Sequence, residues 1–129
     1  MMKPMAMFPV LVAENLDKQQ EFYSTWFGFE SDYYDADFYL HMHHQQSSAQ
    51  LAFMVPNHAS QPAFLQKKAG SDGMVISLEV ESAKDAYAIA KQGGLDIVLD
   101  FIVEEFGVTH FMLRDPAGFV VDIVEHHGH

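Results

Sequence analysis

The chain contains no cysteine and few basic residues, and both absences exclude classes of protein. Without cysteine there is no disulfide framework, no thiolate metal site and no cysteine nucleophile, which suits a reducing compartment. Lys and Arg number 7 against 18 Asp and Glu, which gives a formal net charge of −11. Nucleic acids and anionic membrane surfaces need clustered cations, so we expect neither as a partner.

Long apolar runs are also missing. No run approaches the roughly 18 residues that a membrane helix needs, and Met1–Met7 lacks the apolar core of a signal peptide. We therefore expect a cytoplasmic protein. Hydrophobic residues still make up 49% of the 129 residues, with 11 Phe, 5 Tyr and 1 Trp. This composition can fill the core of one domain and excludes a disordered chain.

Both halves of the chain show the same order of expected elements, namely one strand, one helix and three strands. The first helix follows Asn15, a good N-cap, and ends at Gly28; the second follows Ser82 and ends at Gly93-Gly94. The expected strands cover residues 8–12, 29–34, 38–44 and 50–55, then 74–80, 97–103, 108–113 and 119–124. Gly94 follows Gly28 by 66 residues, and this correspondence indicates an internal duplication.

A polar segment rich in Ser, Pro and Gly separates the two halves. We therefore divide one domain, residues 1–129, into module one (about 6–56), a linker (about 57–72) and module two (about 73–126). Pro62 is well placed to begin a short helix over residues 63–69.

Three segments carry a resemblance to a known family. They are Val-Ala-Glu-Asn-Leu at 12–16 with Glu-Phe-Tyr at 21–23 and Phe-Gly-Phe at 27–29, Ser-Leu-Glu-Val-Glu-Ser at 77–82, and residues 111–125 around the turn Asp115-Pro116-Ala117-Gly118. On these motifs the chain resembles the vicinal oxygen chelate superfamily: glyoxalase I, bleomycin-resistance proteins, fosfomycin-resistance enzymes and extradiol dioxygenases. The resemblance implies an α+β fold of two tandem βαβββ modules, the glyoxalase/bleomycin-resistance fold. Their curled mixed sheets would form a half-barrel around a concave pocket, and the protein would be a homodimer.

The resemblance also allows a test for a metal. Enzymes of the superfamily hold one divalent ion with His and Glu ligands from the first and last strand of each module. Those positions fall here on Phe8, Ala52, Val75 (or Met74) and Asp122. Only Asp122 has a side chain that binds a divalent cation well. We therefore expect no metal of the family type and no cofactor, as in the bleomycin-resistance-like members that lack the metal.

Alternation along the strands predicts the side chains that line the pocket. The predicted ligand-binding residues are Phe8, Val10, Ala52, Met54, Val75, Ser77, Glu79, His110, Met112, Asp122 and Trp26. Trp26 either stacks on a ligand or belongs to the core at the helix end. A mainly apolar lining with a few ionisable groups is typical of a small-molecule site. We predict a binder of a small organic ligand, cationic or aromatic in character; the acidic charge attracts cations or serves solubility alone.

An enzyme is the alternative. His110 and Asp122 lie on neighbouring expected strands, and a carboxylate orients a paired imidazole so that it can act as a general base. The same pair can equally be a satisfied polar contact inside the sheet. A displaced metal site would instead need His41, His43, His110 and Asp122. The protein would then be a lyase, isomerase or dioxygenase of the glyoxalase type, with His110 and Asp122 as its catalytic residues.

The remaining histidines have plainer expectations. His41 and His43 share one strand face and point away from His44, and they would be metal ligands or surface residues near a turn. His126, His127 and His129 are expected on a frayed C-terminus, where they would bind nickel only adventitiously.

Overall fold

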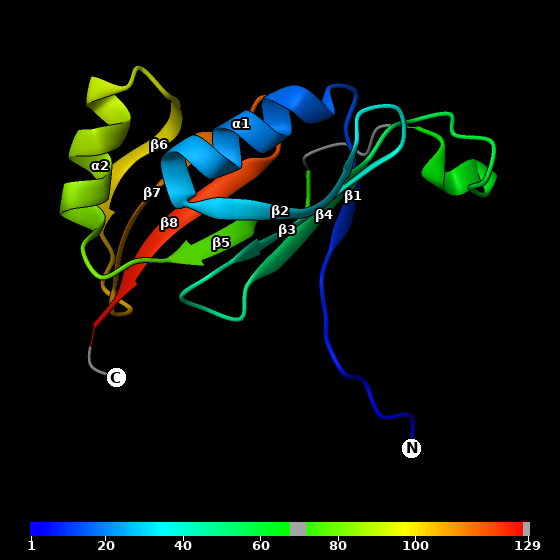
Figure 1. Ribbon diagram of the computed structural model, residues 1–129. Coiled ribbons are helices and arrows are strands. Elements are labelled where there is room, and N and C mark those ends of the chain that lie inside the picture. Colours follow the sequence, from blue (N-terminus) through cyan, green and yellow to red (C-terminus); the bar gives the residue numbers. More distant parts are fainter. Residues whose placement is uncertain (68–71, 128–129) are drawn as a thin grey trace. The chain divides into compact units, whose positions relative to one another are not determined.

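The computed structural model describes residues 1–67 and 72–127 of the chain (Figure 1). The chain forms two compact units, Met1–Ala69 and Gly70–His129, whose boundary falls within the predicted linker. Each unit contains one α-helix and an open four-stranded mixed sheet, so the fold is α+β with two βαβββ modules, as predicted. The half-barrel with its concave pocket, and the single domain, stay predictions. Among the described residues, no helix combines the length and apolar character needed to cross a bilayer.

The first unit pairs its strands in the order β1-β4-β3-β2, with β1 parallel to β4 and the other pairs antiparallel. Its elements are β1 (Val10–Val12), α1 (Leu16–Phe27), β2 (Phe29–Asp35), β3 (Tyr39–His44) and β4 (Gln50–Met54). Asn15 caps α1 by accepting the Lys18 N–H at 3.1 Å. Gly28 ends α1 at φ 71°, a left-handed conformation that favours glycine.

Helix α1 covers one face of the first sheet, and this side holds the core of the unit. Leu40, Met42 and Phe53 on that face are fully buried, and the Tyr23 ring of α1 stacks on Phe53 at 5.6 Å between centroids. Because side chains alternate along a strand, Tyr39, His41 and the residues paired with them lie on the other face.

The second unit repeats this plan in the order β5-β8-β7-β6. Its elements are β5 (Ile76–Glu79), α2 (Ala83–Gln92), β6 (Asp96–Val103), β7 (Val108–Arg114) and β8 (Val120–His126). Strand β5 is parallel to β8, as β1 is to β4. Gly94 after α2 has φ 69°, close to the value of Gly28 after α1. The equivalent topology and these two glycines support the duplication inferred from the sequence.

The turn between β7 and β8 is built around one carboxylate. Asp115 is buried, and its Oδ1 accepts the N–H groups of Ala117 at 2.9 Å and Phe119 at 3.0 Å. These bonds tie the amides of the turn to one side chain and close the turn. The closed turn fixes the register of β7 against β8, in which Met112 lies opposite Asp122.

Several predicted boundaries are wrong. β1 begins at Val10 and β5 at Ile76, so Phe8 and Val75 lie just before the strands rather than within them. The predicted helix over 63–69 is a 3-10 turn, η1 (Ala63–Leu65), and Ala69 lies outside the described residues. The reason is local, since a short helix has few hydrogen bonds to offset its ordering.

The prediction of a frayed C-terminus is also wrong for the residues that the structure describes, which end at His127. His126 is the last residue of β8, and the His127 N–H donates to the Gly107 carbonyl at 2.8 Å. The His127 Nε2 atom lies 2.6 Å from Thr109 Oγ1. The β7 partner strand is long enough to pair this end, because Val108 lies opposite His126. His129 lies outside the described residues.

Candidate functional site

A largely buried polar pair joins β7 to β8 in the second unit. His110 Nδ1 lies 2.8 Å from Asp122 Oδ1, and their side chains are 9% and 14% exposed. An ionised carboxylate can only accept, so the imidazole carries a proton on Nδ1 and donates it to Asp122. The expected contact between these two residues is therefore present, while their catalytic role stays a prediction.

The other ring nitrogen of His110 faces a second carboxylate. Within residues 1–67 and 72–127, the buried Nε2 atom has no hydrogen-bond partner. Glu104 Oε2 lies 3.8 Å from it, beyond hydrogen-bonding distance, and the Glu104 side chain is 28% exposed. The Glu104 N–H donates to the Val108 carbonyl at 2.8 Å, which closes the β6–β7 turn and places Glu104 on the face of His110.

Glu104 was not among the residues predicted from the sequence. The signal was the register of the β6–β7 hairpin, in which Ile102 lies opposite His110 and Val103 opposite Thr109. Continuing that register sets Glu104 opposite Val108, on the same face as His110. The register shifts twice along β6, so the strand boundaries alone do not reveal it.

The face of the second sheet that carries His110 and Asp122 is called here the dyad face; its residues are Ser77, Glu79, Leu99, Ile102, Glu104, His110, Met112, Asp122 and Val124. Cross-strand pairing sets Ser77 opposite Asp122 and Glu79 opposite Val124. Four of these residues, Ser77, Glu79, His110 and Met112, were predicted to share a lining with Asp122, and they do share one sheet face. Leu99 and Ile102 add exposed apolar surface, at 36% and 41% exposure.

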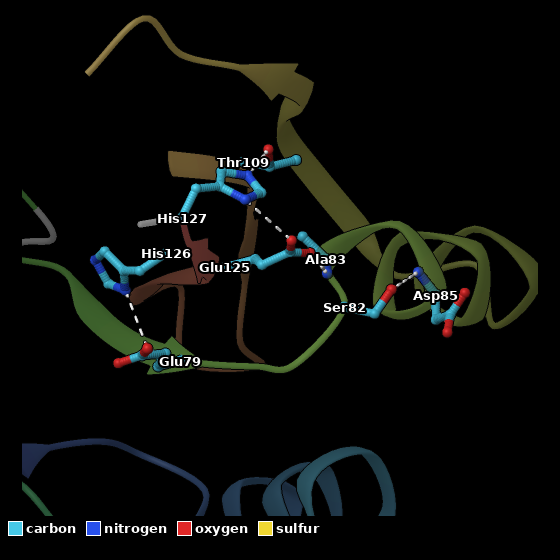
Figure 2. Close-up of polar contacts among 8 residues, drawn as sticks. All are labelled: Glu79, Ser82, Ala83, Asp85, Thr109, Glu125, His126 and His127. Atoms are coloured by element: carbon cyan, nitrogen blue, oxygen red, sulfur yellow. Dashed lines mark hydrogen bonds and ion pairs between the residues drawn. The ribbon is translucent and has the colours of Figure 1, made fainter. Parts of the chain in front are cut away.

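Two carboxylates near the end of β8, those of Glu79 and Glu125, lie on opposite faces of the sheet (Figure 2). Glu79 Oε2 lies 3.3 Å from His126 Nδ1 on the dyad face. Glu125 belongs to the helix side, where its Oε1 accepts the Ala83 N–H at 2.9 Å and its Oε2 lies 3.4 Å from His127 Nδ1. An anion at a helix N-terminus is stabilised by the free N–H groups there, so Glu125 holds α2 in place.

The corresponding face of the first sheet is aromatic. His41 is held on both sides: its Nε2 lies 2.8 Å from Gln50 Oε1, and its Nδ1 lies 3.2 Å from the Tyr39 hydroxyl. Gln50 Oε1 can only accept, so Nε2–H donates to it and the Tyr39 hydroxyl donates to Nδ1. The Phe8 ring meets His41 edge-on at 4.4 Å between centroids. Burial raises the pKa of the Tyr39 phenol above its usual 10.0.

The predicted residues of the first module partly share this aromatic face. Val10 and His41 both lie opposite Ala52, and Met54 lies opposite Tyr39, so the four predicted residues Phe8, Val10, Ala52 and Met54 gather around His41 and Tyr39. Trp26 does not join them, because it lies on α1, the helix that covers the other face.

His43 lies against two carboxylates of its own sheet. Its Nδ1 lies 2.7 Å from Asp32 Oδ1 and its Nε2 lies 4.0 Å from Glu30 Oε2. The register of β2 shifts between Ser31 and Tyr33, and the bulge turns Asp32 towards His43.

Comparison with known proteins rests on the fold. No protein-family model matches the chain, and no curated protein matches its sequence. Among solved structures, a glyoxalase/bleomycin resistance protein/dioxygenase superfamily member from Sphaerobacter thermophilus has a TM-score of 0.76 at 20% identity, covering 98% of this chain and 100% of that one. A lactoylglutathione lyase from Agrobacterium tumefaciens has a TM-score of 0.74 at 19% identity, covering 95% and 94%. A glyoxalase/bleomycin resistance protein/dioxygenase from Nocardioides has a TM-score of 0.75 at 16% identity, covering 98% and 86%.

The chain has the glyoxalase/bleomycin-resistance fold. Identities at this level establish a shared architecture and leave the reaction open, because unrelated chemistries use the same fold.

The metal that this fold implies can be tested against the side chains present. Ala52 is fully buried between Val10 and His41, and neither it, Phe8 nor Val75 has a side-chain atom that binds a cation. The carboxylate of Asp122 already receives the His110 N–H. The described part of the chain holds no group of three His, Asp or Glu residues arranged around a common point. The side chains at the four expected positions therefore do not fit a divalent metal.

Proposed function

We propose that this protein binds a small organic molecule on the dyad face without a metal of the family type. The observation that carries the proposal is the buried His110 Nε2, which has no hydrogen-bond partner in the described residues. Leaving such an atom unpaired costs about 1–3 kcal/mol, and a ligand that donates a hydrogen bond would recover that energy.

The surroundings of His110 support a ligand that is part apolar. Leu99 and Ile102 are exposed on the same face, and Met112 is half-buried between Leu99 and Asp122. Apolar surface around a few convergent polar groups is the usual composition of a small-molecule site. Among proteins of similar fold, one is named for lactoylglutathione and others for bleomycin, which are small molecules.

The aromatic face of the first unit offers related chemistry. Phe8 and Tyr33 are 39% and 52% exposed there, and aromatic rings stack on planar or cationic groups. We propose that this face by itself stacks on planar or cationic groups of small organic molecules.

A thermal-shift screen in the presence of EDTA tests the proposal. We expect at least one compound to raise the melting temperature; occupancy at a hundredfold excess over Kd stabilises by about 2.7 kcal/mol. The shift should disappear in His110→Phe and persist in His58→Phe, whose histidine lies in a loop outside both sheets. Equal shifts in the two variants, or no shift across a broad library, would overturn the proposal.

Metal-free acid–base catalysis is a second candidate, favoured by the His110–Asp122 contact at 2.8 Å. With Nδ1–H held by Asp122, Nε2 has a lone pair that can take a proton next to a substrate carbonyl, and the imidazolium can return it to another atom. Hydrogen–deuterium exchange at the α-carbon of α-hydroxycarbonyl compounds, followed by NMR in D₂O, tests this. Exchange should depend on His110; exchange that is unchanged in His110→Gln would exclude the catalytic role.

A further inference from the structure

On the dyad face His110 Nε2 and the Glu104 carboxylate face each other, and residues 1–67 and 72–127 give Nε2 no hydrogen-bond partner. In the tautomer with its proton on Nδ1, His110 donates to Asp122 Oδ1 and its Nε2 is an acceptor. The Glu104 carboxylate is an acceptor as well, and its Oε2 lies 3.8 Å from Nε2. We infer that the ligand carries a protonated amine that binds between His110 Nε2 and Glu104 Oε2. The inference rests on the proposed function and names the chemical class of the ligand.

The geometry favours a nitrogen with several protons. A donor about 2.8–3.0 Å from each acceptor completes two hydrogen bonds at once. An ammonium group carries three N–H donors and can satisfy both acceptors, whereas a hydroxyl carries one and satisfies only one. The charge of the ammonium also faces the Glu104 carboxylate, and hydrogen bonds to ionised groups are the stronger ones. A neutral alcohol of the same shape therefore binds this site less tightly.

Glu104 also controls access to the imidazole. The Nε2 atom is buried, whereas the Glu104 side chain is 28% exposed and follows the last residue of β6. An ammonium group reaches the buried Nε2 only if the partly exposed Glu104 side chain moves aside. The apolar part of the ligand then lies on Ile102 and Leu99, which are exposed on the same face.

Benzylammonium and benzyl alcohol are suitable probes, since they differ mainly in the donor group and its charge. Binding to the full chain is followed by NMR of the histidine ring nitrogens, with His110 assigned from a His110→Gln variant. We expect benzylammonium to bind at least about tenfold more tightly than benzyl alcohol and to shift the His110 Nε2 resonance. Glu104→Gln should remove most of that preference. Glu105→Gln makes the same change of charge at the adjacent exposed residue and should keep it.

The outcomes separate the two proposals. Equal affinity for the two probes, or equal weakening of benzylammonium by Glu104→Gln and Glu105→Gln, would overturn the ammonium site, because the effect would then be one of net charge. Suppose that one of these results is found, but benzyl alcohol or another neutral compound shifts the His110 ring-nitrogen resonances. The ammonium site is then wrong, and the proposal of ligand binding on the dyad face still stands. If benzylammonium leaves His110 unshifted at millimolar concentration, the ammonium site is wrong, and a library without any binder overturns the proposed function with it.

Discussion

Replacing Asp122 by alanine removes the only acceptor that the described residues offer to the His110 Nδ1–H. The contact is 2.8 Å long and lies between side chains that are 9% and 14% exposed, so water cannot easily take the place of the carboxylate. A buried donor left unpaired costs about 1–3 kcal/mol. We expect the free energy of unfolding to fall by that amount.

Two further substitutions calibrate this value. Asp122→Asn keeps an oxygen that can accept the Nδ1–H. This variant should therefore lose less free energy of unfolding than Asp122→Ala. Asp96→Ala removes the same charge from an exposed position on β6 and should change stability by no more than about 0.5 kcal/mol. The difference between Asp122→Ala and Asp96→Ala therefore isolates the contact from the general effect of removing an acidic charge.

Urea unfolding followed by far-UV circular dichroism measures these differences. His110→Phe provides the second test, because it removes the donor and fills much of the same volume. In that background Asp122→Ala should cost much less than in the wild type, which gives a coupling energy for the pair. Two results would contradict this reasoning. Asp122→Ala could have the same free energy of unfolding as Asp96→Ala, or it could lower that free energy equally with and without His110. In either event the His110–Asp122 hydrogen bond does not stabilise the fold.

Three other predictions concern the scaffold. Gly28→Ala should destabilise by about 1–2 kcal/mol in thermal unfolding because Gly28 has φ 71°, whereas Gly93→Ala, at φ −77°, should be tolerated. Burial raises the Tyr39 pKa above 10.0, so its stabilising contribution is intact below pH 10.0 and is lost as the pH rises through the folded pKa. Urea unfolding at pH values on both sides of 10.0 should show this loss of stability, and Tyr39→Phe should remove it. Glu125→Ala should cost about 0.5–2 kcal/mol and speed hydrogen exchange at the Ala83 amide, because that amide loses its acceptor; unchanged exchange would contradict the capping role.

The elements of the fold were predictable because their signals are local. Asn15 and Ser82 do cap the two helices, and Gly28 does end the first one. The Asp115 turn forms as expected because its side chain bonds amides only two and four residues away. The two-residue period of a strand also predicted which residues share a face, since that period survives small errors in the strand ends.

The candidate site was predictable only where it depends on that period. His110 and Asp122 meet because they lie on one face of adjacent strands joined by a short turn. Trp26 lies apart from the other predicted residues of its module because α1 covers the opposite face of the sheet, and only the packing of helix on sheet decides that. His127 was misjudged because its partners, Gly107 and Thr109, lie some twenty residues earlier in the chain.

The sequence by itself therefore determined the order of elements, the repeated βαβββ plan and the side chains that cannot bind a metal. These depend on residue type and on spacing within a few positions. Only the tertiary structure set Glu104 3.8 Å from His110 and turned Asp32 towards His43. The physical reason is register: a bulge or a turn shifts one strand against its neighbour and changes which side chains meet, while the residues of each strand remain the same.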